Sequence, residues 1–232
     1  MKFRIPNEVV YFAAICGLAL AVAMVASAGF GMSMIVAPAY ILSRRFTALT
    51  FGQMEYVVQA CLFVVLCIAV GGFRTVFLCA FANCLVYGAV LDFLRFVIPV
   101  LNPHVTPPGS LPFAARVCLF AAGLVLTGAS VAAFYKTYMY PQVYDFFVRA
   151  VSGHFGISRL KFKYCFDFTC LFSAMALTFL FFGRLVGVGV GTLITASTMG
   201  LLIEFFCAVY DRFFVLEPFF KDFAKHFELR KK

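Results

Sequence analysis

Charged residues are scarce in this chain. Only 12% of its 232 residues are Asp, Glu, Lys or Arg, whereas soluble globular domains contain about 25%. Hydrophobic residues make up 64% of the chain, and the mean hydropathy is +1.00. A water-soluble fold of this length needs a more polar surface than such a composition supplies. The composition therefore excludes an ordinary cytosolic enzyme, a disordered chain and a disulfide scaffold, and it predicts an integral membrane protein.

The sequence also lacks the patterns that hold metals or carry out hydrolysis. It has nine cysteines but no C-x-x-C pair, and a free cysteine in an apolar run packs as a small hydrophobe. Its three histidines, His104, His154 and His226, fall in expected connections and the tail, away from any buried nucleophile. We therefore expect no metal site, no cofactor and no catalytic residue. An intramembrane lipid enzyme is disfavoured for the same reason.

Six apolar segments have the length of about 20 residues that a membrane-spanning helix needs. They cover residues 9–30, 54–72, 75–97, 113–134, 164–182 and 185–209. Two shorter apolar stretches, within residues 31–53 and 139–163, follow the first and fourth spans. Stretches of about 10–14 residues are too short to cross and are typical of re-entrant or interfacial helices. The expected fold is an all-α polytopic membrane protein.

The cations are distributed unequally between the two sides that six spans define. Fourteen Lys and Arg residues fall in the termini and in the connections after the second and fourth spans, against at most five on the other side. The positive-inside rule then places both termini in the cytoplasm. It also explains the net charge of +9, so we expect no nucleic-acid partner.

The second half of the chain repeats the first at an offset of 112 residues. The aligned pairs include Glu55 with Asp167, Gly88 with Gly200, and Asp92 with Glu204. Four of the five acids between residues 9 and 209 pair under this one shift, which chance explains poorly. We divide the chain into a first three-helix repeat (1–100), a periplasmic turn-rich linker (101–112), a second repeat (113–210) and a basic cytoplasmic tail (211–232).

Each repeat contains three spans, so the two halves must insert with opposite orientations. Inverted repeats are typical of secondary transporters, in which the site lies near the midplane where the halves meet. The expected function is therefore a small transporter or exporter of a small solute that works by alternating access. Inherited duplication without a transport role is the alternative reading of the same pattern.

Acids within the membrane are the first candidates for a substrate or ion pathway. An Asp at the centre of a span costs about 2.5–3.5 kcal/mol on insertion scales, so such groups face the bundle interior or a cavity. Asp92 and Glu204 are the leading candidates, and Asn83, Gln59, Glu55 and Asp167 are secondary lining. Two local roles compete with this one. Glu55 and Asp167 fall in the expected first turn of their spans, where the helix dipole favours acids, and Asp92 can pair with Arg95.

Five glycines are candidates for flexibility or close packing. Gly88 and Gly200 end a line of small residues that leads to an acid one turn later, so other helices can approach closely there. Gly187, Gly189 and Gly191 stand at the expected start of the last span, where they allow flexing or the approach of backbone to a ligand. Without a preceding strand and a Lys, this run is not a phosphate-binding loop.

Several segments resemble the YitT/YczE-like family of bacterial multi-pass inner-membrane proteins. The likeness is carried by Gly187–Ile194 with Gly200–Phe206 near the end, and by Ala28–Gly31, Pro38 and Thr50–Gln53 after the first span. The resemblance implies membrane topology and a bacterial origin, but the activity of that family is poorly defined. Some members carry an added cytoplasmic C-terminal domain, where this chain has a short basic tail.

The expected partners are the lipid bilayer and a small-molecule or ion substrate, with a homodimer left open. Intramembrane acids would couple transport to protons or cations. The competing hypothesis is a substrate-binding membrane subunit of an ATP-driven vitamin importer, which six helices and an Ala19-x-x-x-Ala23 docking face would suit. The repeat argues against it, because those subunits do not work by exchanging halves.

Overall fold

The architecture comes from a computed structural model that describes residues 3–72, 75–139, 142–217 and 219, the side chains of Phe3 and of 75–79 excepted. The chain is mostly helical. The described residues form α1 (Asn7–Ala28), α2 (Ala37–Arg45), α3 (Phe51–Val70), α4 (Thr75–Val97), α5 (Phe113–Lys136), α6 (Val143–His154), α7 (Arg159–Phe182) and α8 (Val190–Phe213).

Six of these helices, α1, α3, α4, α5, α7 and α8, are long and apolar enough to cross a membrane. The prediction of six such segments is confirmed, and the protein is a multi-pass membrane protein. The short helices α2 and α6 follow the first and fourth spans, where short helices were expected. The last span begins at Val190 rather than residue 185, because Gly187 has a φ of +76° that an α-helix cannot contain.

Two spans begin earlier than the sequence predicted, which changes the depth of their acids. A capping box closes the start of α3: the Thr50 hydroxyl accepts from the N–H of Gln53, and the Gln53 side chain accepts from the N–H of Thr50. The helix α3 therefore starts at Phe51, and α7 starts at Arg159. Glu55 and Asp167 thus lie beyond the first turn, and the prediction of a first-turn position was wrong for both.

Helices α1 and α5 form the antiparallel centre of the bundle. Gly17 of α1 lies against Ser130, and further along α1 Ala21 and Val25 lie against Gly123. At the far end the Nε of Arg116 donates to the carbonyl of Ala28 at 2.7 Å. A Cβ on Gly17 would lie only 2.6 Å from the Ser130 hydroxyl. Small residues let two membrane helices approach this closely.

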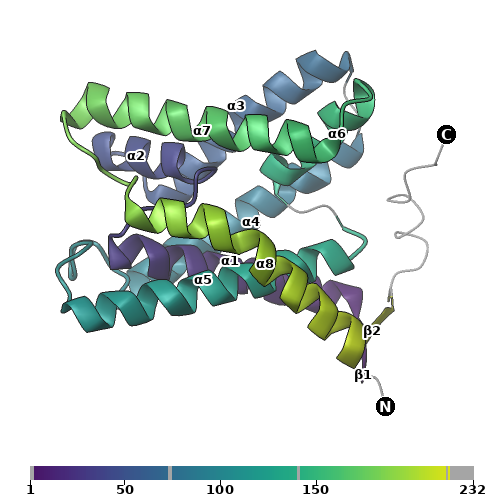
Figure 1. Cartoon of the computed structure of the whole chain (residues 1–232), viewed down its shortest axis with the longest axis horizontal. Helices are drawn as coiled ribbons and strands as arrows, with labels where there is room; N and C mark the ends of the chain where they lie inside the picture. The colour runs from purple at the N-terminus through teal and green to yellow at the C-terminus, as the bar shows by residue number, and fades with distance from the viewer. Residues whose placement is uncertain (1–2, 73–74, 140–141, 218, 220–232) are drawn as a thin grey trace.

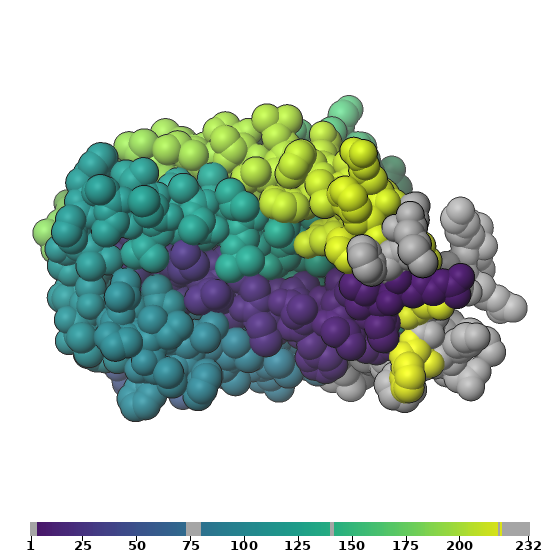
Figure 2. Space-filling view, turned by 90° about the horizontal axis from the view of Figure 1, so that it is seen from below, coloured from purple at the N-terminus to yellow at the C-terminus, as the bar shows by residue number. Residues whose placement is uncertain are grey.

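The other helices pack around this central pair (Figure 1). Helix α4 packs on α1, and α8 packs on α5. Helix α2 lies against α7 and α3, while α6 lies against α3 and α7. Figure 2 shows α1 as a purple band with teal residues on both sides. Helices α3 and α4 pack along each other, whereas α7 and α8 make at most marginal contact within the described part of the chain.

A two-stranded parallel sheet that the sequence did not predict joins the chain ends. Strand β1 (Phe3–Pro6) pairs with β2 (Phe214–Glu217), so both ends of the described chain lie at one end of the bundle. An even number of spans requires this placement. The expected basic tail (211–232) therefore starts inside α8 and continues as β2. Residues 220–232 lie outside the described residues.

Candidate functional site

A buried carboxyl group connects α3 to the start of α6. Glu55 of α3 has no exposed surface. Its Oε2 accepts a hydrogen bond from Nε2 of Gln59 at 3.0 Å and another from the hydroxyl of Tyr144 at 3.1 Å. The Oε1 of Gln59 in turn accepts from the backbone N–H of Val143 at 3.3 Å. These bonds join two residues of α3 to the first turn of α6.

The local sequence explains why α6 begins here. The first N–H groups of any helix have no partner within that helix, and Gln59 supplies one for Val143 from the neighbouring α3. Val143, Phe147 and Val151 recur at helical spacing, and they share a buried apolar cluster with Leu66 of α3. The helix α6 is therefore fixed along α3 by an apolar face and at its start by polar bonds.

Several polar atoms near this carboxyl have no hydrogen-bond partner within the described residues. They are Glu55 Oε1, both side-chain polar atoms of Asn83, and Nε2 of Gln142. Asn83 lies one turn before Tyr87 on α4, and the Sγ of its neighbour Cys84 lies 4.0 Å from the backbone carbonyl of Glu55. Most buried polar groups in native proteins are satisfied. Their clustering marks a place for a proton, water or ligand.

We call Glu55, Gln59, Asn83, Tyr87, Gln142 and Tyr144 the Glu55 cluster. Every member except Glu55 is neutral in its ordinary state. No ion pair found among the described residues involves Glu55. Burial, with a smaller contribution from the Glu55 carboxyl, raises the pKa of Tyr144 well above its usual value. The Tyr144 hydroxyl therefore stays a hydrogen-bond donor at neutral pH.

Asp92, a leading candidate from the sequence, lies outside the Glu55 cluster. Its carboxylate accepts from the N–H of Gly52 at 2.8 Å and from the hydroxyl of Thr50. Both donors stand at the start of α3, so Asp92 joins the end of α4 to the positive end of the α3 dipole. Arg95 does not extend toward solvent. It is buried, and its guanidinium lies 5.2 Å from the ring centroid of Phe51.

The other two acids lie in different places again. Glu204 is exposed on α8. The Oδ1 of Asp167 lies 3.6 Å from the Nζ of Lys163, one turn earlier on α7, and the same Nζ lies 3.8 Å from Asp145. Of the six residues that the sequence proposed for the pathway, the structure brings Glu55 and Gln59 into direct contact, with Asn83 nearby. Asp92, Glu204 and Asp167 are separate from them.

Four of the five proposed glycines lie at close approaches. A Cβ on Gly88 would overlap Tyr56 of α3, and Cβ atoms on Gly187, Gly189 and Gly191 would meet Tyr40, Phe30 and Phe120 within 3.0 Å. Gly200 differs, because a Cβ there would meet nothing within 4 Å.

Sequence reasoning missed Tyr87, Gln142 and Tyr144. Gln142 and Tyr144 stand in the short segment after the fourth span, among apolar residues. Polar side chains in this short apolar segment were the signal that could have identified them, because polar groups buried among apolar helices need internal partners.

The chain belongs to the family of unknown function DUF6198, whose model matches residues 5–208. No curated protein and no solved structure matches the chain. The matched region contains the whole Glu55 cluster. Because the family carries no described activity, the chemistry of the site has to be argued from its geometry.

Asp92 and Glu204, which align under the repeat, are expected to differ in their effect on stability. Replacing Asp92 by Ala removes a partner from the Gly52 N–H and the Thr50 hydroxyl, which costs about 1–3 kcal/mol. Glu204→Ala should leave stability almost unchanged, because this side chain is exposed. Thermal unfolding of both variants in detergent micelles measures the difference. An equal loss of stability in the two would contradict the placement of Asp92.

Proposed function

We propose that this protein is a small secondary transporter that moves a small solute by alternating access and couples the movement to a proton at Glu55. The observation that carries the proposal is the fully buried carboxyl of Glu55, which has one oxygen without a partner. A charged group inside the membrane is costly and is a functional site by default. One proton on Oε1 would neutralise this carboxyl without disturbing the bonds to Oε2.

Protonation would weaken the attachment of α6. Hydrogen bonds to an ionised carboxylate are about twice as strong as bonds between neutral groups. Tyr144 donates to Glu55 directly, and Gln59 contacts both Glu55 and Val143. A proton on Glu55 would therefore loosen the start of α6 from α3. In this proposal α6 is the gate, and Glu55 sets its position.

The packing of the helices supports an origin from two inverted halves. In this arrangement each helix of the first half, α1 to α4, corresponds to the helix four places later, α5 to α8. The packing of α4 on α1 then corresponds to the packing of α8 on α5. The contact of α6 with α3 likewise becomes that of α2 with α7, and α2 with α3 becomes α6 with α7. The antiparallel α1 and α5 exchange with each other, as an inverted pair requires.

The packing of α4 on α3 has no equivalent between α8 and α7 among the described residues, which supports alternation between the halves. Gly88 of α4 lies against Tyr56 of α3. The residues aligned with them at the offset of 112 are Gly200 and Phe168, and Phe168 is 51% exposed while Gly200 has open space beside it. We propose that α8 closes on α7 in the opposite state of the cycle, while α4 separates from α3. The two halves would thus exchange conformations.

The location in the bacterial inner membrane with cytoplasmic termini belongs to the same proposal. The cation distribution supports it, as does the pairing of β1 with β2 at one end of the bundle. Kinship with the YitT/YczE-like family is consistent with it.

Proton coupling through Glu55 can be measured in proteoliposomes that contain a pH-sensitive dye. At least one solute from a panel of small carboxylates, amines and sugars should acidify the lumen as it enters. In Glu55→Gln this proton movement should fall about tenfold or more, equivalent to at least about 1.4 kcal/mol. Glu217→Gln is the matched control, because the Glu217 side chain is 55% exposed in β2. Solute entry with full acidification in Glu55→Gln would contradict the proposal.

Exchange between the halves predicts a second pair of contacts. In a background without native cysteines, Tyr56→Cys with Gly88→Cys should cross-link readily with a short thiol reagent. Phe168→Cys with Gly200→Cys should cross-link more slowly, through the opposite state, and added Glu55→Gln should alter the ratio of the two rates. If the second pair never cross-links while the first does, the halves do not exchange.

A further inference from the structure

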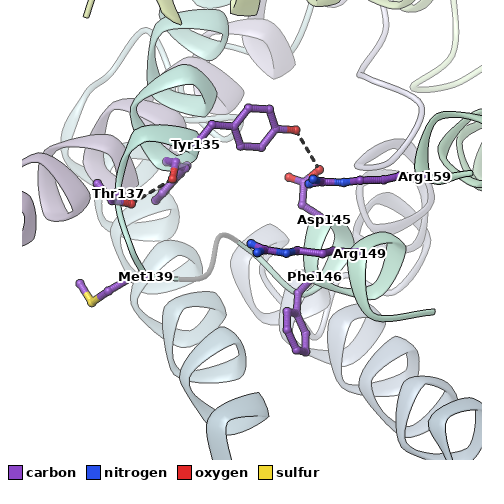
Figure 3. A pocket seen from close by; sticks show the side chains of 8 residues that line it. Tyr135, Thr137, Met139, Asp145, Phe146, Arg149 and Arg159 are labelled. Atoms are coloured by element: carbon purple, nitrogen blue, oxygen red, sulfur yellow. Dashed lines mark hydrogen bonds between the residues drawn. The ribbon is translucent and has the colours of Figure 1, made fainter. Parts of the chain in front are cut away.

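A pocket of about 360 Å³ lies between the end of α5, helix α6 and the start of α7 (Figure 3). Its polar wall consists of Tyr135 near the end of α5, Asp145 and Arg149 of α6, and Arg159 at the start of α7. The neighbouring Lys136 pairs with Asp211 of α8, close to β2. The pocket therefore lies at the end of the bundle that carries β1 and β2.

Two arginines, Arg149 and Arg159, and one aspartate, Asp145, provide the charged groups in the wall of this pocket. In Figure 3 the side chains of Arg149 and Arg159 both extend into the space that faces Tyr135. The carboxylate of Asp145 is already shared, since its Oδ1 lies 3.5 Å from the Tyr135 hydroxyl and 3.8 Å from the Nζ of Lys163. Two guanidinium groups thus line the pocket with one carboxylate that a lysine also approaches. The planar fork of arginine matches carboxylate and phosphate groups.

We propose that this pocket binds a small anion that has a carboxylate or phosphate group and an apolar body. Phe134, Met139 and Phe146 supply the apolar part of the wall. The volume lies within the range of about 300–1,000 Å³ that is typical of small-molecule sites. The inference names the class of the transported solute, and in that role it rests on the proposed function. Binding itself does not depend on transport.

The pocket and the Glu55 cluster share one short helix. Tyr144 donates to Glu55, while its neighbour Asp145 and, one turn later, Arg149 line the pocket. The two sites therefore lie on different faces of α6. An anion bound to Arg149 and a proton that weakens the bond from Tyr144 to Glu55 would both act on α6. This arrangement suits the joint movement of an anion and a proton.

Anion binding can be followed with one engineered fluorophore, because the chain contains no Trp. Met139→Trp places the reporter in the pocket wall, and the protein is reconstituted in phosphatidylcholine nanodiscs. Benzoate or phenyl phosphate should change the fluorescence saturably. Arg149→Gln and Arg159→Gln should each weaken binding about tenfold, as expected for a lost charge-assisted hydrogen bond. Arg149→Lys keeps the positive charge but not the planar guanidinium, so it should weaken anion binding less. This variant also tests whether position 149 tolerates substitution.

Arg212→Gln is the matched control, because it removes one charge from the last turn of α8 at the same end of the bundle. It should leave binding unchanged. Nanodiscs that also contain phosphatidylglycerol distinguish a free anion from a lipid headgroup. If this lipid competes with the added anion, and the competition depends on Arg149 and Arg159, the site binds a lipid headgroup. A response that neither arginine affects, or none to any anion, overturns the inference. Arginine-dependent binding without transport contradicts the proposed function alone.

Discussion

A carboxyl group inside an apolar helical bundle has to be neutralised or surrounded by hydrogen-bond donors. In this protein that constraint fixes the position of α6 against α3. Glu55 is fully buried in a spanning helix, and its donors come from Gln59 and from Tyr144 of the short helix α6. Gln59 also provides the partner that the first N–H of α6 needs. The position of α6 is thus determined by how Glu55 is satisfied, and a change in its charge has a direct route to a change in structure.

The second half of the bundle differs from the first half at the position that corresponds to Glu55 and in the packing of its last two helices. In the proposed repeat Asp167 aligns with Glu55, and it meets Lys163 on its own helix instead of a tyrosine from a short helix. Helix α8 lies apart from α7, and Gly200 has open space where Gly88 contacts Tyr56. Similar sequences in two different arrangements are what a transporter with exchanging halves requires, and this difference supports the proposed cycle.

Hydropathy was enough to predict the six long helices and the places of the two short ones, because each depends on the length of an apolar run. The pathway residues were harder. The sequence placed Asp92 above Glu55 as a candidate, yet Asp92 accepts from the start of α3 while Glu55 faces α6. The position of a residue along its helix can be predicted from the sequence. The neighbouring helix that its side chain faces cannot. Tyr144 and the pairing of β1 with β2 depend on contacts between segments more than 80 residues apart, which no local pattern encodes.

The central claim is that Glu55 takes up and releases a proton inside the bundle. Infrared difference spectroscopy of the reconstituted protein during acidification measures this directly, through the stretching band of a protonated carboxyl group. The account predicts a band that is absent in Glu55→Gln, shifted in Tyr144→Phe by the lost hydrogen bond, and unchanged in Asp92→Asn. A spectrum in which Glu55→Gln leaves every carboxyl band unaltered would contradict it.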